Sequence, residues 1–415
     1  MARTPKKEKG TPKKKKGENQ SEIRIRMHTV GFGDCFLLFL PTSAGIKKVL
    51  IDCGSLKKKS LSISEVADAV RTASTDADGV ARIDIVVMSH RHADHISGFV
   101  PGRWDGVEVK EVWMPWLESR ADNTARTLRK ASDRRIRQLI ATFQAAGVSE
   151  DLLQVLLNAR SNEDSLDVLH EGFAGKARRR FLPEKETAVE AVECDHLPGI
   201  KTFVLGPPRD EKALKSDDPP TGESFLREYV NDSAAGGSTK RFQPLSVDWV
   251  SNDPPALPDR DAIRQSVENL AAYEAAAAAV DAELNNTSLI IIFKVGSEYL
   301  LFPGDAQWGP WEKVLQDEDA VALLEKVTFI KVGHHASHNA SPVSVIRKHL
   351  GKKNVHGGAV KAMISVTPYA QWKGVPYKPL LEELNATRFT TANSDLLQDQ
   401  PGFTRKDDIW IEAKL

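Results

Sequence analysis

Four potential metal ligands stand within six residues of this sequence, at His90, His92, Asp94 and His95. They follow residues 83–88, an apolar and β-branched run that predicts a buried strand. A tight loop after such a strand would bring the four side chains into one small volume. Imidazole suits zinc, and a carboxylate can hold a second ion or orient a water molecule. A polar loop with histidines by chance is the alternative, but the H-x-H-x-D-H spacing favours a site for two divalent metal ions.

Further candidate ligands follow three other predicted strands. They are Asp52 after residues 49–51, Asp305 after residues 299–302, and His334, His335 and His338 after residues 327–332. Polar side chains at the carboxyl ends of neighbouring strands meet at one edge of a sheet. Asp305 alone could be an ordinary turn aspartate. Taken together, these residues predict two cation sites bridged by a carboxylate, which would turn a shared water into a hydroxide nucleophile.

The composition excludes several classes of protein. Of the 415 residues, 41% are hydrophobic and 27% are charged, and the formal net charge is zero, so the whole molecule is not steered toward nucleic acid. No apolar run reaches eighteen residues, so we expect no membrane span. The sparse cysteines, Cys35, Cys53 and Cys194, suggest a reducing, cytoplasmic setting without a disulfide framework.

The chain divides into a tail, a regular core and two segments that look inserted. Residues 1–20 are rich in Lys, Pro and Gly and are predicted to be disordered. A solubilising tail is the preferred interpretation, and a weak tether to nucleic acid is the alternative. We expect residues 21–415 to form one domain, with insertions at about 116–200 and 208–285.

The first inserted segment predicts a helix with a basic surface. Apolar residues recur at helical spacing over residues 136–143, and Ser149 opens a second helix. The basic residues around them are Arg126, Arg129, Lys130, Arg134, Arg135 and Arg137. A solvated helix face is the slightly preferred interpretation, and a lid that faces nucleic acid is the alternative.

The string at residues 90–95 resembles the signature of the metallo-β-lactamase-fold hydrolases. The flanking segments 30–38, 50–54, 285–289, 302–305 and 331–335 are similar to the hydrolase domain of ComEC-type DNA-uptake proteins and their soluble relatives. The motif order matches over nearly the whole chain after the tail, apart from the two insertions, and the ComEC channel is absent. The resemblance implies a stand-alone α/β protein, an αββα sandwich of two β-sheets with outer helices, extended by helical and loop insertions.

The resemblance also implies a ligand set. His90 and His92 would form the first metal site, Asp94 and His95 the second, and Asp305 would bridge the two ions. We expect zinc in both sites, with manganese as the alternative. Asp94 would also orient or deprotonate the attacking water.

Other roles implied by the resemblance are less specific. One histidine of the 334–335 pair would complete the second site, with His334 preferred and the other lying behind it. Asp52 would support the metal loop. His338 or Ser337 could assist the leaving group.

One departure from the family concerns the first site. Most members carry a further histidine ligand before the bridging aspartate, and the corresponding place here is residues 286–288, as in the ComEC-like relatives. The first site would then be more oxygen-rich, which suits manganese. His196 is a possible replacement, although an ordinary loop histidine is preferred. Asn286 is therefore expected to touch metal or substrate.

These features predict a metal-dependent phosphodiesterase, and a nuclease acting on DNA or RNA in the first instance. One alternative is a hydrolase of small esters, lactones or nucleotides, with the insertions as a lid over the substrate. A second alternative is a non-catalytic, partner-binding module of a defence or DNA-processing system. A basic groove beside the metals would favour the nuclease, and the sequence names no protein partner.

Overall fold

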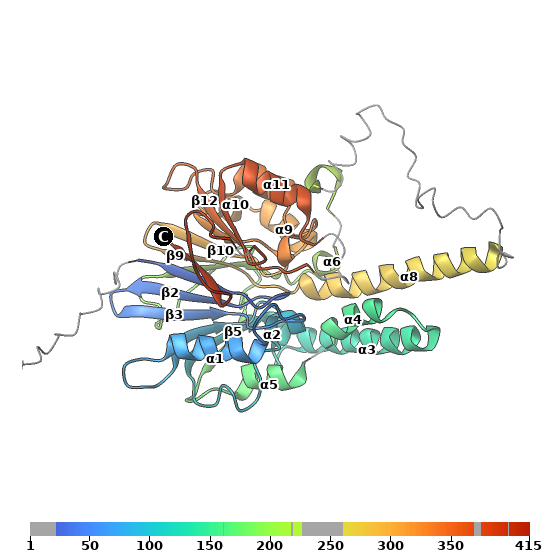
Figure 1. Cartoon of the computed structure of the whole chain (residues 1–415), viewed down its shortest axis with the longest axis horizontal. Helices are drawn as coiled ribbons and strands as arrows, with labels where there is room; N and C mark the ends of the chain where they lie inside the picture. Colours follow the sequence, from blue (N-terminus) through green and yellow to red (C-terminus); the bar gives the residue numbers. More distant parts are fainter. Residues whose placement is uncertain (1–21, 161, 217–218, 226–259, 369–374, 397) are drawn as a thin grey trace, which may run out of the picture.

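Two mixed β-sheets lie face to face in the computed structural model, which describes residues 22–160, 162–216, 219–225, 260–368, 375–396 and 398–415 (Figure 1). Within these residues the first sheet has, in spatial order, β14 (Phe403–Lys406), β15 (Trp410–Lys414), β1 (Arg24–His28), β2 (Phe36–Thr42), β3 (Gly45–Ile51), β4 (Arg82–Val87), β5 (Glu108–Pro115) and β6 (Arg178–Leu182). The second has β13 (Phe389–Asn393), β12 (Val360–Ile364), β11 (Phe329–Lys331), β10 (Glu298–Phe302), β9 (Ile290–Val295), β8 (Lys201–Gly206) and β7 (Glu190–Val192).

Each sheet joins an antiparallel half to a parallel half. Strands β1 to β3 pair antiparallel and β3 to β6 pair parallel, while β8 to β10 pair antiparallel and β10 to β13 pair parallel. The two histidine loops follow β4 and β11, which occupy corresponding positions in the two sheets. Because parallel strands end at the same edge, this topology brings the loops together.

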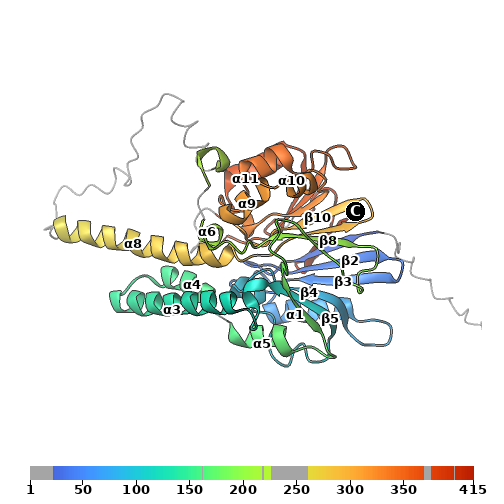
Figure 2. The same ribbon diagram turned by 180° about the vertical axis from the view of Figure 1, so that it is seen from behind.

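Helices cover the outer faces of both sheets. Helices α1 (Ile63–Ser74) and α5 (Glu163–Glu171) lie against the first sheet, and α9 (Trp308–Leu315), α10 (Glu318–Leu324) and α11 (Lys378–Ala386) lie against the second (Figures 1 and 2). The short elements are α2 (Ala93–Ile96), α6 (Glu211–Leu214), η1 (Trp116–Glu118), η2 (Thr221–Glu223), η4 (His334–Ala336) and η5 (Val345–His349). The predicted αββα sandwich is confirmed.

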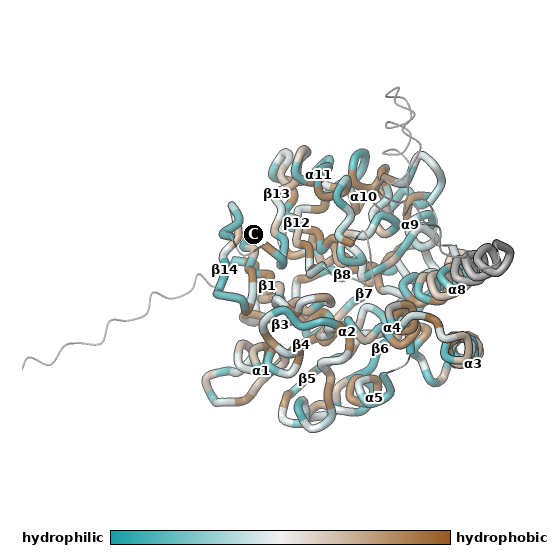
Figure 3. The backbone as a smooth tube through the Cα atoms, turned by 45° about the vertical axis from the view of Figure 1, so that its right-hand side comes forward, coloured by the Kyte–Doolittle hydropathy of each residue, from teal (hydrophilic) through white to brown (hydrophobic). Residues whose placement is uncertain are grey.

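The largest apolar cluster fills the space between the two sheets. Trp113 of β5 stacks on Phe293 of β9, with ring centroids 6.1 Å apart, so the two sheets meet through aromatic faces. Two further clusters fill the spaces between each sheet and its own helices. Hydrophobic segments accordingly concentrate in the strands (Figure 3). Full burial of one such ring contributes about 1.5–3 kcal/mol.

Three helices from the segments 116–200 and 208–285 lie side by side and project from one edge of the sandwich (Figures 1 and 2). They are α3 (Asn123–Ala146), α4 (Glu150–Ala159) and α8 (Arg260–Asn285). Phe143, Leu156 and Val280, one from each helix, belong to one apolar cluster, which fixes the three helices to one another. Segments that are far apart in the sequence therefore form one helical projection.

Side-chain caps fix where two of the outer helices begin. Ser62 caps α1, because its backbone N–H and hydroxyl both bind Glu65 and the serine oxygen accepts the Glu65 N–H in return. Asp317 accepts the N–H of Ala320 and begins α10, which separates this helix from α9. The predicted tail, residues 1–20, lies outside the described residues.

The sequence predicted neither a membrane span nor a disulfide framework. Among the described residues, no helix combines the length and the apolar character that a membrane crossing needs. Cys35, Cys53 and Cys194 are all free thiols.

The aromatic contact between the sheets gives the first prediction. Phe293→Ala should lower the free energy of unfolding by about 3–5 kcal/mol, because it leaves a cavity under Trp113. Val355, which is 60% exposed, is the matched control, and Val355→Ala should change stability by less than about 0.5 kcal/mol. Urea unfolding measures both, and equal effects of the two substitutions would contradict this account of the core.

His28, at the end of β1, gives a prediction about pH. In the described structure neither ring nitrogen has a hydrogen-bond partner, and burial, with Arg26 as a second cause, lowers the pKa of His28 to about 3. The unfolded chain binds this proton near pH 6.5, so stability falls as the pH drops from about 6.5 to 3, by at most about 1.4 kcal/mol per pH unit. His28→Leu should reduce the fall in stability between pH 7 and 4.5, measured by urea titrations of metal-free protein, by the share of this one proton. His334, whose pKa burial also lowers, keeps part of the slope. An unchanged slope would show that His28 does not contribute to it.

Candidate metal centre

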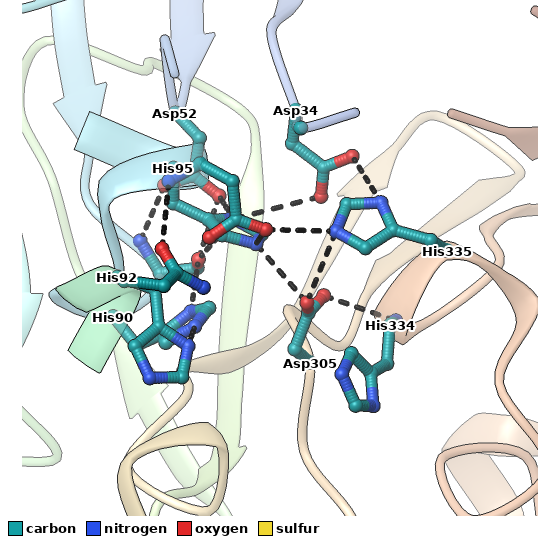
Figure 4. A network of polar contacts seen from close by, with 12 residues as sticks. Asp34, Asp52, His90, His92, His95, Asp305, His334 and His335 are labelled. Atoms are coloured by element: carbon teal, nitrogen blue, oxygen red, sulfur yellow. Dashed lines mark hydrogen bonds and ion pairs between the residues drawn. The ribbon is translucent and has the colours of Figure 1, made fainter. Parts of the chain in front are cut away.

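Two histidine loops and one aspartate turn meet where the two sheets come together (Figure 4). The loop after β4 runs into α2, the turn after β10 holds Asp305, and β11 leads into η4. The predicted ligands that converge here, each at most 3% exposed, are His90, His92, Asp94, His95, Asp305 and His335. The structure therefore brings together side chains from both halves of the chain.

Asp94, His95, Asp305 and His335 form the tightest group. The Nε2 atom of His95 lies 3.0 Å from Oδ2 of Asp305, and Nε2 of His335 lies 2.9 Å from Oδ2 of Asp94. One ligand atom from each residue lies within 4.8 Å of the other three. Imidazole nitrogens and carboxylate oxygens this close together can hold a divalent ion.

The outer nitrogens of both histidines have fixed partners. Nδ1 of His335 donates to the carbonyl oxygen of Ser365 at 2.8 Å, and Nδ1 of His95 lies 2.9 Å from Oδ2 of Asp52. Both rings therefore turn Nε2 inward. Burial alone would lower the pKa of each ring, but the neighbouring carboxylates, Asp305 above all, raise both pKa values. The same negative field favours a divalent cation between the rings.

Several buried polar atoms at this centre lack a hydrogen-bond partner among the described residues. They include Oδ1 of Asp94, Oδ1 of Asp34 and Nε2 of His92. An unpaired buried polar group costs about 1–3 kcal/mol, so such atoms are rare in a folded protein. The unpaired Asp94 oxygen and the imidazole and carboxylate donors around it fit a pair of divalent ions.

Asp52 supports the metal loop, at the place where the sequence predicted such a residue. Its carboxylate accepts the backbone N–H of Ser89 at 2.7 Å and the Ser89 hydroxyl at 2.6 Å, in addition to its contact with His95. The backbone of Asp52 has a φ of 55°, a conformation that costs a non-glycine residue about 1–2 kcal/mol. The three hydrogen bonds offset this strain.

Lys331, on β11, is a residue of this centre that the sequence analysis missed. Its ammonium group donates to Oδ1 of Asp305 at 2.8 Å and to the Gly304 carbonyl at 3.0 Å, and it forms an ion pair with Asp34. Burial would raise the pKa of Asp305, but Lys331 and then His95 hold it well below its usual range. The sequence did contain a sign of this role, because Lys331 is the single charged residue within the largely apolar run 327–332.

His90 and His92 lie together as the first-site prediction requires. Nε2 of His90 is 3.0 Å from Nδ1 of His92, and Nδ1 of His90 is 3.1 Å from the Ser89 hydroxyl. The two facing nitrogens can bind one ion. Among the described residues, no third His, Cys, Asp or Glu forms a comparably tight ligand group with this pair.

The structure distinguishes the two histidines of η4. His335 faces the carboxylates, whereas the ring of His334 lies 2.8 Å from the Ser337 hydroxyl and its backbone N–H donates to Asp305 at 3.0 Å. The φ angles of His334, His335 and Ala336 are 46°, 51° and 63°. This left-handed turn directs His335 toward the carboxylates, so His335 is the histidine of the pair that joins the tight group, and which of the two binds metal stays a prediction.

Asn286 binds neighbouring backbone groups. Its amide nitrogen donates to the carbonyls of Leu214 and Ser216 at 3.2 and 2.9 Å, and its amide oxygen accepts the Gln307 N–H at 2.9 Å. These contacts join α6 to the turn after Asp305. Its expected contact with metal or substrate stays a prediction.

Two other histidines lie apart from the tight ligand group. The ring of His338 lies 5.9 Å from that of Tyr377. Its predicted help to the leaving group stays a prediction. His196 lies in the turn of the β7–β8 hairpin. Gly206, at the other end of β8, pairs with Ile290, which begins β9 beside the candidate centre. The turn with His196 is therefore at the strand ends that face away from the centre, so His196 does not replace the missing ligand.

The helical projection reaches the metal centre through residues that no sequence motif indicates. Asn158 of α4 accepts the backbone N–H of Asp94 at 3.4 Å. Arg91, within the metal loop, pairs with Glu118 at 2.9 Å and with Asp133 of α3 at 3.3 Å. These contacts come from segments separated from the loop by tens of residues, so spacing alone could not predict them.

Comparisons with known proteins add little to these observations. No protein-family profile matches the sequence, and no curated protein matches it. Among solved structures, the chain is similar to the metallo-beta-lactamase fold protein YhfI from Bacillus subtilis. The alignment covers 90% of this chain and 96% of that chain, with 10% sequence identity and a TM-score of 0.35. With so low an identity and TM-score, the likeness carries no information about substrate or reaction.

Close packing behind the metal loop gives a prediction. A Cβ at Gly54 would overlap the backbone of Asp94 and lie 2.5 Å from the His95 nitrogen, whereas a Cβ at Gly106 would meet no atom within 4 Å. Gly54→Ala should therefore displace α2, lower stability by about 1–3 kcal/mol and reduce the zinc retained after dialysis. Gly106→Ala is the matched control and should retain zinc. Equal zinc contents, measured by elemental analysis, would show that the packing of Gly54 does not position the ligands.

Proposed function

We propose that this chain is a metal-dependent hydrolase of the metallo-β-lactamase type. The observation that carries the proposal is the buried group of Asp94, His95, Asp305 and His335, whose ligand atoms lie within 4.8 Å of one another. The proposed ligands are His90 and His92 for the first ion, Asp94, His95 and His335 for the second, and Asp305 between them. Zinc is the expected ion, and manganese is the alternative.

Bound divalent ions would lower the pKa of a shared water toward neutrality and stabilise negative charge on a substrate oxygen. Oδ2 of Asp94 lies 2.9 Å from Nε2 of His335, so both atoms face the proposed second ion, and the buried Oδ1 of Asp94 would remain to orient that water and accept its proton. His334 is half-buried beside Asp305, and burial lowers the pKa of its ring to about 4. At neutral pH its uncharged ring can therefore offer a substrate oxygen a hydrogen bond but no positive charge.

We extend the proposal to phosphodiesters, with nucleic acid as the preferred substrate. Arg126, Lys130, Arg134 and Arg137 are exposed on α3, and their spacing of four, four and three residues places them in one stripe along the helix. Such a stripe can follow a phosphate backbone. The similarity of the motif segments to ComEC-type hydrolase domains favours the same substrate class.

A small-molecule ester, lactone or nucleotide hydrolase is the second candidate, and one observation favours it. The six proposed ligands are almost wholly buried, beneath contacts from α4 and α8. A cavity of only about 30 Å³ lies beside the metal loop, lined by residues that include Arg91, Leu128, Ser132 and Thr287. A centre this enclosed admits a small ligand more readily than a duplex.

Cleavage assays test the proposed function. Metal-stripped protein, resupplied separately with zinc, manganese or magnesium, should cut labelled single- or double-stranded DNA or RNA. Asp94→Asn should reduce the rate by about 10²–10⁴-fold, because the group that orients the water is lost. The matched control is Asp105→Asn, which changes an exposed aspartate and should keep the wild-type rate.

The other outcomes of this assay separate the candidates. Hydrolysis of a generic phosphodiester or lactone without nucleic-acid cleavage would favour the small-molecule enzyme. A protein that binds metal and hydrolyses none of these substrates would contradict the hydrolase proposal.

The basic stripe gives a separate prediction. The double variant Lys130→Ala, Arg134→Ala should weaken nucleic-acid binding. The slope of the logarithm of the binding constant against the logarithm of the salt concentration should become shallower by the amount that about two phosphate contacts contribute. The control double variant Lys352→Ala, Lys378→Ala removes two exposed lysines, one in the turn after η5 and one at the first residue of α11. Fluorescence anisotropy at several salt concentrations measures both. Equal affinities and slopes would remove the stripe as support for a nucleic-acid substrate.

A further inference from the structure

Most of the proposed histidine ligands use one ring nitrogen for the metal and the other for a fixed partner. The outer nitrogen of His90 faces the Ser89 hydroxyl at 3.1 Å, that of His95 faces Asp52 at 2.9 Å, and that of His335 faces the Ser365 carbonyl at 2.8 Å (Figure 4). Such partners set the tautomer and the ring orientation of a metal ligand.

His92 departs from this pattern. Its Nδ1 lies 3.0 Å from Nε2 of His90, so its outer nitrogen is Nε2, and that atom has no hydrogen-bond partner among the described residues. The ring is 2% exposed, so water cannot readily supply one. The acidic group that faces this nitrogen is Asp281, whose Oδ1 lies 3.8 Å away.

Asp281 is held in position by its own helix and by the helical projection. Its other oxygen, Oδ2, accepts the side-chain N–H of Asn285, one turn further along α8, at 3.0 Å. Helix α8 is in turn fixed to α3 by the ion pair between Arg135 and Glu283 at 2.7 Å and by their shared apolar cluster. One oxygen of Asp281 is therefore occupied, and the other remains for His92.

We propose that Asp281 is a positioning residue for the first metal site, which accepts the Nε2–H of His92 and keeps Nδ1 turned toward His90. The inference rests on the proposed function, since it assigns the His90–His92 pair to an ion. It makes the first site dependent on α8, a helix of the segment 208–285 that carries none of the six proposed ligands.

The chemistry of the substitution Asp281→Asn follows from the contact with Asn285. Because Asn285 donates an N–H to position 281, the amide oxygen of the variant would remain on that side. Its amide nitrogen would then face Nε2 of His92 and donate to it. That contact stabilises the tautomer with the proton on Nδ1, which cannot bind a metal ion.

Zinc titration of the full chain by calorimetry, with elemental analysis after dialysis, tests the proposal. The wild type should bind two zinc ions. Asp281→Asn should weaken one of them by about 10–100-fold and leave the other unchanged. Glu274→Gln, which changes an exposed carboxylate of the same helix, should match the wild type. Asn285→Ala should weaken the same site by a smaller factor, because it releases Oδ2 of Asp281.

A double-mutant cycle separates positioning from direct ligation. If Asp281 acts through His92, adding Asp281→Asn to His92→Ala should cause no further loss of zinc affinity. A full additional loss would overturn the proposal and make Asp281 a ligand itself. Nitrogen-15 NMR of labelled histidines should show the Nε2–H tautomer of His92 in the wild type and its loss in Asp281→Asn.

The remaining outcomes distinguish this proposal from the proposed function. Two zinc ions bound by Asp281→Asn with wild-type affinity would overturn the role of Asp281 alone. Absence of zinc binding by the wild type would overturn the metal centre, and this inference with it. Loss of both ions together with lower stability of metal-free Asp281→Asn would show a general structural role and would also overturn the proposal.

Discussion

The interaction on which the rest of the structure depends is the charge balance of four aspartates buried where the two sheets meet. Asp34, Asp52, Asp94 and Asp305 are each at most 3% exposed. An ionised carboxylate in such a place costs several kcal/mol unless it is paired. Lys331 forms ion pairs with two of them, and two imidazoles with raised pKa values meet the others. A divalent cation is the natural further partner for this much negative charge.

That negative charge acts on a fifth carboxyl group, Asp281, and disfavours its ionised form. Burial first, and then Asp94 and Asp305, raise the pKa of Asp281 to about 7. The helices that bring Asp281 and Asn158 to the centre also cover it. Under the proposed function, the helical projection would therefore both position the first ion and limit the size of the substrate that reaches it.

The sequence predicted the centre where its signal was local and failed where the signal depended on tertiary packing. Apolar strands that end in histidines or aspartates predicted the convergence of the 90–95 loop with Asp305. His335 could not be separated from His334, because the choice depends on three consecutive left-handed residues. Asp281 belongs to no recognisable motif, because its place at the centre depends on the proximity of α8 to His92, which is almost two hundred residues away along the chain. The C-terminal strands β14 and β15 were missed because their short, mixed sequences become strands only by pairing beside β1.

The central claim is that the two histidine loops and Asp305 hold two divalent ions. Anomalous diffraction from crystals grown with zinc, recorded on both sides of the zinc absorption edge, tests it most directly. The account predicts two anomalous peaks on opposite sides of Asp305, one beside His90 and His92 and the other beside His95 and His335. The absence of peaks at this centre, with the protein folded and zinc in the crystal, would contradict it.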